Sequence, residues 1–107
     1  MDKKIKYDKL IRDKIPAIIK NSGKDCVTRV LSDMEYKEFL YRKLQEEVDE
    51  FLADDNISEL ADITEVILAI LELKKSSPQE METIRLKKLK ERGGFKKKLL
   101  LKEVINN

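Results

Sequence analysis

The chain has 107 residues, of which 41% are charged and 41% hydrophobic, and its formal net charge is +2. This length suits one domain over residues 1–107, and a single cysteine, Cys26, excludes an intrachain disulfide. The longest aliphatic run, residues 66–71, is too short to span a bilayer, and the opening residues lack the apolar core of a signal peptide. We therefore expect a cytoplasmic protein without membrane contact, built from amphipathic helices with solvated outer faces.

Charge is distributed unevenly along the chain. Residues 1–24 carry eight Lys or Arg against three Asp, whereas residues 33–72 carry thirteen Asp or Glu against three Lys or Arg. Residues 73–107 are basic again, with eleven Lys or Arg against four Glu. Nucleic-acid-binding domains usually present a basic face without such an acidic block, which disfavours nucleic acid as a partner. A site that holds both a divalent cation and a polyphosphate would require both signs of charge.

The first part of the chain predicts one short helix and one short strand. Pro16 suits the first turn of a helix, so a helix is expected over residues 16–20 and should end at residues 21–23. Residues 26–31 alternate and are rich in β-branched side chains, which predicts a strand. Residues 96–104 are either a second strand or a tail, and pairing of the two segments would give a small two-stranded ribbon.

Three longer helices begin at a Ser or Asn that is followed three residues later by Glu, a pattern typical of helix N-termini. The three starts are SDME (32–35), NISE (56–59) and SPQE (77–80). The corresponding helices are predicted over residues 33–54, 57–75 and 78–92. The last one should end where Gly93 or Gly94 takes the left-handed conformation.

The connection between the first two long helices is short, so they should be antiparallel neighbours. We therefore predict a mainly α fold, an antiparallel helical bundle that carries the small ribbon if the two strands pair. The helix over residues 57–75 is apolar almost all round, which predicts deep burial. Two amphipathic neighbours cannot cover such a helix completely, so we expect a homodimer or a higher homo-oligomer.

Two pairs of carboxylates lie beside the apolar faces of these helices. The apolar stripe of the first long helix consists of Tyr36, Leu40, Leu44, Val48 and Phe51. Glu47 falls within this stripe and Glu50 lies three residues further on, while Glu59 and Asp62 share one face of the second helix. Converging carboxylates raise one another's pKa unless a cation lies among them. Hard oxygen ligands of this kind are what Mg²⁺ prefers.

The composition also limits the choice of metal. The chain contains no histidine, which argues against a Glu-x-x-His di-iron site and against the usual catalytic zinc site. The competing interpretation is that such carboxylate pairs are ordinary solvated helix surface. Glu46 and Glu65 fit either interpretation, as surface charges or as outer partners of a metal site.

At this point the sequence resembles a known family. EEVDEF (46–51) and SELADITEV (58–66) resemble the E-x-x-E…E-x-x-D signature of the all-α nucleoside triphosphate pyrophosphohydrolases, the MazG and phosphoribosyl-ATP pyrophosphohydrolase superfamily. Three further segments resemble a small house-cleaning branch of it: YDKLIRDKIPAIIKNSGK (7–24), TRVLSDMEY (28–36) and KLKERGGFKKKLLL (88–101). The eight residues 51–58 between the two carboxylate pairs are fewer than is usual in that superfamily.

The resemblance implies a MazG-like fold and a Mg²⁺-dependent hydrolase that cleaves a nucleotide between its α and β phosphates, releasing a monophosphate and pyrophosphate. Carried over by position, the metal ligands are Glu47, Glu50, Glu59 and Asp62. Either Glu47 or Glu50 would also take the proton of the attacking water.

Basic residues at both ends of the chain would then bind the substrate phosphates. These residues are Lys9, Arg12, Lys14 and Arg92. The N-terminal residues Lys9, Arg12 and Lys14 also fit an ordinary solvated basic end. Arg92 with the two glycines after it fits either an anion-binding turn or a plain helix C-cap. No residue selects phosphoribosyl-ATP over an ordinary or damaged nucleoside triphosphate. The alternative function is a non-catalytic helical interaction module whose basic ends bind an acidic partner or nucleic acid.

Overall fold

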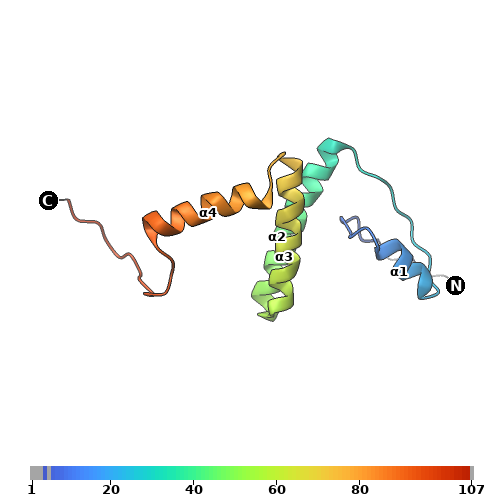
Figure 1. Ribbon diagram of the computed structural model, residues 1–107. Coiled ribbons are helices and arrows are strands. Elements are labelled where there is room, and N and C mark those ends of the chain that lie inside the picture. Colours follow the sequence, from blue (N-terminus) through green and yellow to red (C-terminus); the bar gives the residue numbers. More distant parts are fainter. Residues whose placement is uncertain (1–3, 5, 107) are drawn as a thin grey trace. The chain divides into compact units, whose positions relative to one another are not determined.

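The computed structural model describes Lys4 and residues 6–106, and within them the secondary structure is entirely helical (Figure 1). The helices are α1 (Ile15–Asn21), α2 (Asp33–Asp54), α3 (Ile57–Leu73) and α4 (Pro78–Arg92). The mainly α fold class is confirmed. The chain forms two units, Met1–Lys75 and Ser76–Asn107, and the interpretation of residues 1–107 as one domain stays a prediction.

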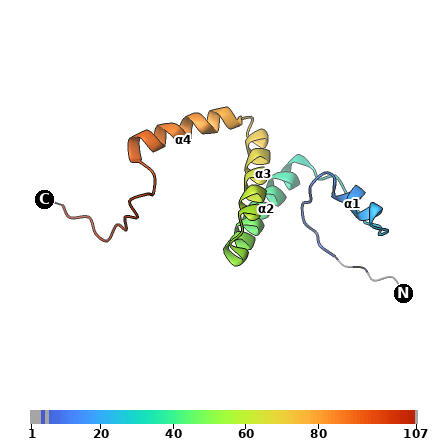
Figure 2. The same ribbon diagram turned by 60° about the horizontal axis from the view of Figure 1, so that its bottom comes forward.

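The packed part of the first unit is a hairpin of α2 and α3, which lie side by side and antiparallel (Figures 1 and 2). Asp55 follows α2 in the left-handed conformation, at φ 51° and ψ 43°, and its N–H donates to the carbonyl of Phe51. Aspartate tolerates this conformation better than most residues with a side chain. Asn56 then begins α3, because its side chain accepts from the N–H of Ser58. The chain therefore reverses within two residues, as the short connection predicts.

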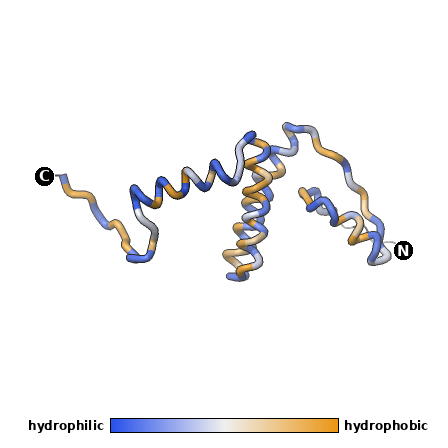
Figure 3. Tube along the Cα trace, in the orientation of Figure 1, coloured by the Kyte–Doolittle hydropathy of each residue, from blue (hydrophilic) through white to orange (hydrophobic). Residues whose placement is uncertain are grey.

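The core of this hairpin is small. Leu40 of α2 and Val66 of α3 are its buried apolar residues among those described, and Glu47 of α2 is buried beside them. The deep burial predicted for the helix over 57–75 is wrong within a single chain: Ile57 is 82% and Leu60 43% exposed. The physical reason is that α2 covers one side of α3 only. Figure 3 shows hydrophobic residues recurring along this hairpin.

The start of α2 is held by the predicted capping box. The Ser32 hydroxyl accepts from the N–H of Glu35, and the Glu35 carboxylate accepts from the N–H of Ser32, both at 3.2 Å. Arg29 adds two hydrogen bonds to the same carboxylate, at 3.0 and 2.6 Å. The Arg29 hydrogen bond and then the Ser32 N–H lower the pKa of Glu35 to about 2. A residue outside the helix thus reinforces its first turn.

The strand predicted over residues 26–31 is wrong, and of the two alternatives for residues 96–104 the structure shows the tail and not the strand. Residues 26–31 and 96–104 are extended or turn-like but pair with no other described segment. Val27 and Val30 are 101% and 97% exposed. Alternating β-branched residues favour a strand only where a neighbouring strand pairs with the backbone, because strand preference depends largely on packing. Side-chain bonds from Arg29 to α2 hold the first segment instead.

The second unit contains α4 and the segment after it. Ser77 accepts from the N–H of Glu80 at 3.1 Å and Pro78 occupies the first turn, as the sequence predicts. Gly93 ends the helix at φ 79° and ψ −177°, so its φ is positive but its ψ is extended. The prediction of a left-handed C-cap is therefore wrong for Gly93, because the left-handed region requires a ψ of about +47°. Of the residues described in this unit none is buried, and no helix between Lys4 and residue 106 has the length and apolarity needed to cross a membrane.

The lowered pKa of Glu35 predicts an acid-sensitive contribution to stability. The carboxylate is favoured in the folded state, so its contribution is full above the ordinary pKa of 4.5 and is lost as the pH falls to about 2. Urea unfolding followed by circular dichroism should show Glu35→Gln less stable than wild type at neutral pH, with the difference closing across this window. Glu38→Gln, which removes an exposed pair with Arg42 on the same helix, is the matched control and should change stability less. An equal difference at all pH values would contradict this account.

Candidate metal centre

The hairpin brings together three of the four carboxylates predicted as metal ligands. Glu47, Glu50 and Glu59 each offer one oxygen, and these oxygens lie within 4.8 Å of one another. Glu47 and Glu50 are three residues apart near the end of α2, and Glu59 lies in the first turn of α3. Two oxygens on the same Mg²⁺ are about 3–4 Å apart. Small side-chain rotations would therefore bring the three oxygens within reach of one cation.

Glu47 is the buried member of this cluster. Glu47 is 7% exposed, and its Oε2 atom has no hydrogen-bond partner in the described structure. Its Oε1 atom lies 3.3 Å from the Nζ atom of Lys43. Burial raises the pKa of Glu47. The ammonium of Lys43 lowers this pKa, and the negative charge of Glu50 raises it further. A buried carboxylate oxygen without a partner is costly, and a cation beside it would satisfy it.

Glu59 shows the same accumulation of negative charge from the other helix. Partial loss of water raises the pKa of Glu59, and the nearby carboxylates Asp54, Glu50 and Asp62 raise it further. These groups come from the end of α2 and the start of α3, which the tight connection forces together. Carboxylate oxygens are hard ligands, so the donor set suits Mg²⁺ or another hard divalent cation.

Asp62, the fourth predicted ligand, is bound to an arginine. Its Oδ1 atom accepts a hydrogen bond from Nη2 of Arg12 at 2.8 Å, and it is not among the three clustered oxygens. Asp62 follows Glu59 by three residues on α3, so one helical turn separates it from the cluster. Its assignment as a metal ligand stays a prediction.

Two of the predicted phosphate-binding residues lie against the carboxylate region. Arg12 contacts Asp62 on α3, and the Nζ atom of Lys9 lies 3.6 Å from Glu46 on α2. Within the described ranges, Lys14 takes part in no ion pair. Arg92 ends α4 in the second unit. The roles of Lys14 and Arg92 in phosphate binding stay predictions.

Lys43 is a site residue that sequence reasoning missed. Its side chain is 16% exposed, and its Nζ atom lies 3.4 Å from Glu46 and 3.3 Å from Glu47. The signal was present in the sequence: Lys43 precedes Glu47 by four residues, a spacing that places two side chains together on a helix. Lys43 supplies the positive charge nearest to the buried carboxylate.

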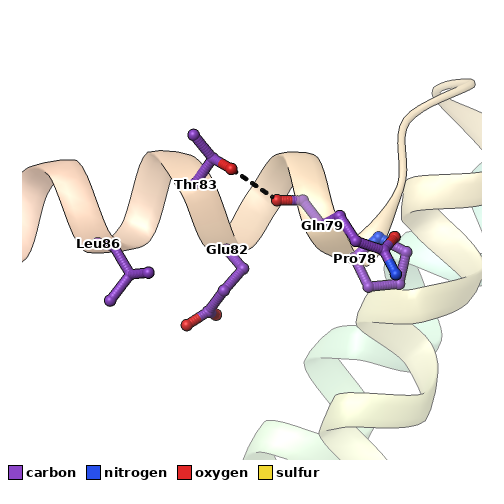
Figure 4. Close-up of a pocket in the computed structure, with 5 residues that line it drawn as sticks. All are labelled: Pro78, Gln79, Glu82, Thr83 and Leu86. Carbon is purple, nitrogen blue, oxygen red and sulfur yellow. Dashed lines mark hydrogen bonds between the residues drawn. The ribbon is translucent and has the colours of Figure 1, made fainter.

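A shallow pocket on α4 offers no comparable chemistry. It is lined by Pro78, Gln79, Glu82, Thr83 and Leu86, all from one helix (Figure 4). The Thr83 hydroxyl donates to the carbonyl of Gln79 at 3.0 Å, an ordinary bond within a helix. With a wall on one side only, the pocket cannot surround a substrate, and it is not a candidate site.

Comparison with known proteins assigns no family or function to this chain. A protein from Mycolicibacterium smegmatis (strain ATCC 700084 / mc(2)155), itself uncharacterized, is 52% identical over 46 residues. The matched segment covers 43% of this chain and 47%, about half, of that relative. No protein-family model and no solved structure matches the chain. The resemblance to the pyrophosphohydrolase superfamily therefore stays a prediction.

The buried charge of Glu47 predicts that a neutral side chain of the same shape stabilises the metal-free protein. Because the pKa of Glu47 is raised, the ionised form is disfavoured in the folded state at neutral pH. In the presence of a chelator, Glu47→Gln should raise the melting temperature by a few degrees, on the order of 2–5 °C. Glu46→Gln is the control, since Glu46 is paired with Lys9 and Lys43 and its loss should give no gain. A lower melting temperature for Glu47→Gln would show that its ionised form stabilises the fold.

Proposed function

We propose that the protein is a Mg²⁺-dependent pyrophosphohydrolase that cleaves a nucleotide between its α and β phosphates. The observation that carries the proposal is the unpartnered, buried oxygen of Glu47, which lies in a cluster with Glu50 and Glu59. Basic side chains from residues 9–12 lie against the same hairpin. This reaction needs a cation site with positively charged side chains beside it that can bind the phosphates.

The residues of the chain divide the chemistry between them. Glu47 and Glu59 would hold the cation, which when bound neutralises phosphate charge and orients a water molecule. Glu50 is exposed and within reach of the same cluster, so one of its oxygens can bind while the other accepts the proton of the attacking water. Lys9 and Arg12 would bind the substrate phosphates, and the planar fork of Arg12 suits bidentate contact.

The competing function is a non-catalytic interaction module, and the second unit favours it. Three large apolar side chains of α4, Ile84, Leu86 and Leu89, are 52%, 50% and 44% exposed beside many basic residues. Such a surface would bind an acidic partner with an affinity that falls steeply as salt is added. The hydrolase should instead respond to Mg²⁺ through its carboxylates.

Product analysis tests the enzyme proposal directly. With Mg²⁺ and a panel of nucleoside triphosphates, deoxynucleoside triphosphates and phosphoribosyl-ATP, the wild type should release a monophosphate and pyrophosphate. Glu50→Gln should lower the turnover by about 100-fold or more, because it removes the group that accepts the proton of the attacking water and one carboxylate ligand of the cation. Asp49→Asn is the matched control, since Asp49 is exposed and accepts a hydrogen bond from Gln45 outside the cluster.

Two results would count against the hydrolase. Release of orthophosphate and a diphosphate would place the cleavage at another bond. No turnover of any substrate, together with no Mg²⁺-induced rise in melting temperature, would favour the interaction module.

We also propose that a second copy of the chain covers the outer side of α3. Leu60, Leu68 and Leu71 lie on the side of this helix away from Val66, and none of the three is buried. A helix of this composition is stable in water only when its apolar sides are covered. A homodimer would complete the small core formed by Leu40 and Val66.

Sedimentation velocity tests the dimer at micromolar concentration. The wild type should sediment as a dimer, and Leu71→Glu should shift it towards the monomer because a charge cannot be buried unpaired in an apolar interface. Glu65→Gln, a change at an exposed position of the same helix, should leave the distribution unchanged. A monomeric wild type would refute this proposal without affecting the proposed chemistry.

A further inference from the structure

Arg12 is bound to Asp62, the one predicted metal ligand that lies outside the carboxylate cluster. Its Nη2 atom donates to Oδ1 of Asp62 at 2.8 Å, while Glu47, Glu50 and Glu59 have their oxygens together one helical turn away. A guanidinium stays charged at any ordinary pH. Asp62 therefore already has a cationic partner at Oδ1 that belongs to the chain, and a divalent cation that binds the same oxygen must displace it.

The contact is exchangeable. The side chains of Arg12 and Asp62 are 56% and 40% exposed, and ion pairs with this much access to water are worth about 0–1 kcal/mol. A divalent cation held by Glu47, Glu50 and Glu59 would attract Asp62 from within the same face of α3. By contrast, the unpartnered Oε2 atom of Glu47 is buried and has no alternative partner to give up.

Arg12 would remain beside the site after such an exchange. Lys9, three residues earlier, lies 3.6 Å from Glu46 on α2. The carbonyl of Arg12 accepts from the N–H of Ile15 at 3.1 Å, at the start of α1. Neither contact involves Asp62: the Lys9–Glu46 pair links this segment to α2, and the bond to Ile15 fixes the backbone locally. A released guanidinium would stay next to the carboxylates, with its fork free for an anion.

We propose that Arg12 and the divalent cation compete for Asp62, so that cation binding transfers Arg12 from Asp62 to a phosphate of the substrate. This inference rests on the proposed function and adds to it an order of events at the same site. Without cation, Arg12 neutralises Asp62 and its fork is engaged. With cation, Asp62 becomes a ligand and Arg12 becomes a phosphate-binding residue. By linkage, the cation and the phosphate then strengthen each other's binding.

The test measures Mg²⁺ binding to the full chain by isothermal titration calorimetry, without nucleotide. Removing the competitor should tighten binding, so Arg12→Gln should lower the Mg²⁺ Kd by about two- to fivefold. Arg42→Gln is the matched control: Arg42 is 64% exposed and pairs with Glu38 outside the cluster, so the same loss of charge should change the Kd little. Asp62→Asn should weaken binding. Circular dichroism would check that each variant is folded.

A second readout follows the guanidinium itself. In the wild type, the Arg12 side-chain N–H resonance in ¹⁵N NMR should shift on addition of Mg²⁺ alone, and in Asp62→Asn it should already lie at the shifted position. With Mg²⁺ saturating, the Kd for inorganic pyrophosphate should rise at least about tenfold in Arg12→Gln but not in Arg42→Gln.

The outcomes separate the two ideas. If the wild type binds Mg²⁺ but Arg12→Gln binds it no more tightly than Arg42→Gln, the exchange is overturned while the proposed function stands. Weaker Mg²⁺ binding by Arg12→Gln would also overturn it, because Arg12 would then be positioning Asp62 for the cation. If the wild type binds no Mg²⁺ and turns over no nucleotide, both the exchange and the proposed function fail.

Discussion

The burial of the Glu47 carboxylate between α2 and α3 is the constraint on which the candidate site depends. Glu47 continues the apolar stripe of α2, so the packing that covers Leu40 also removes Glu47 from water. Lys43 offsets the charge at one oxygen and leaves the other without a partner. A fold selected for stability alone would place an apolar residue there. A ligand that brings positive charge to this position would offset the cost of burying the carboxylate, which supports the proposed cation site.

The basic N-terminal segment gives this acidic hairpin two kinds of counter-charge. Lys43 is a nearly buried partner on the same helix, close to Glu47 through the helical repeat. Lys9 and Arg12 come from a distant part of the chain and make exposed contacts with Glu46 and Asp62. The first kind is fixed by the fold, whereas the second is weak enough to exchange. Under the proposed exchange, this arrangement would neutralise Asp62 without a cation and release Arg12 to a phosphate when a cation binds.

The parts of the structure that sequence reasoning predicted are those determined by short-range interactions. The bounds of α2 and α4 agree with the prediction because Ser32 and Ser77 cap the helix starts through neighbouring residues. The α3 helix ends at Leu73, two residues earlier than predicted. The convergence of Glu47, Glu50 and Glu59 followed from the helical repeat and a short connection.

The parts that could not be predicted depend on distant partners. A strand at residues 26–31 would have required a second strand, which local alternation cannot supply. The bond between Arg12 and Asp62 joins residues 50 positions apart, and no local pattern pairs two particular charges at that distance. The pair of Lys43 and Glu47 is different, because its four-residue spacing is a local pattern from which the contact could have been predicted.

The sparse core favours assembly through a side of α3 that is separate from the candidate site. With Leu40 and Val66 as its buried apolar residues, the hairpin depends for further stability on whatever covers α3. The same helix carries Glu59 and Asp62 on one side and Leu68 and Leu71 on another. Glu59 and Asp62 lie on the Val66 side of α3, which faces α2, whereas Leu68 and Leu71 lie across the helix from it. A partner that covers the two leucines would therefore not lie over the carboxylates, so the proposed assembly and the proposed cation site can be tested independently of each other.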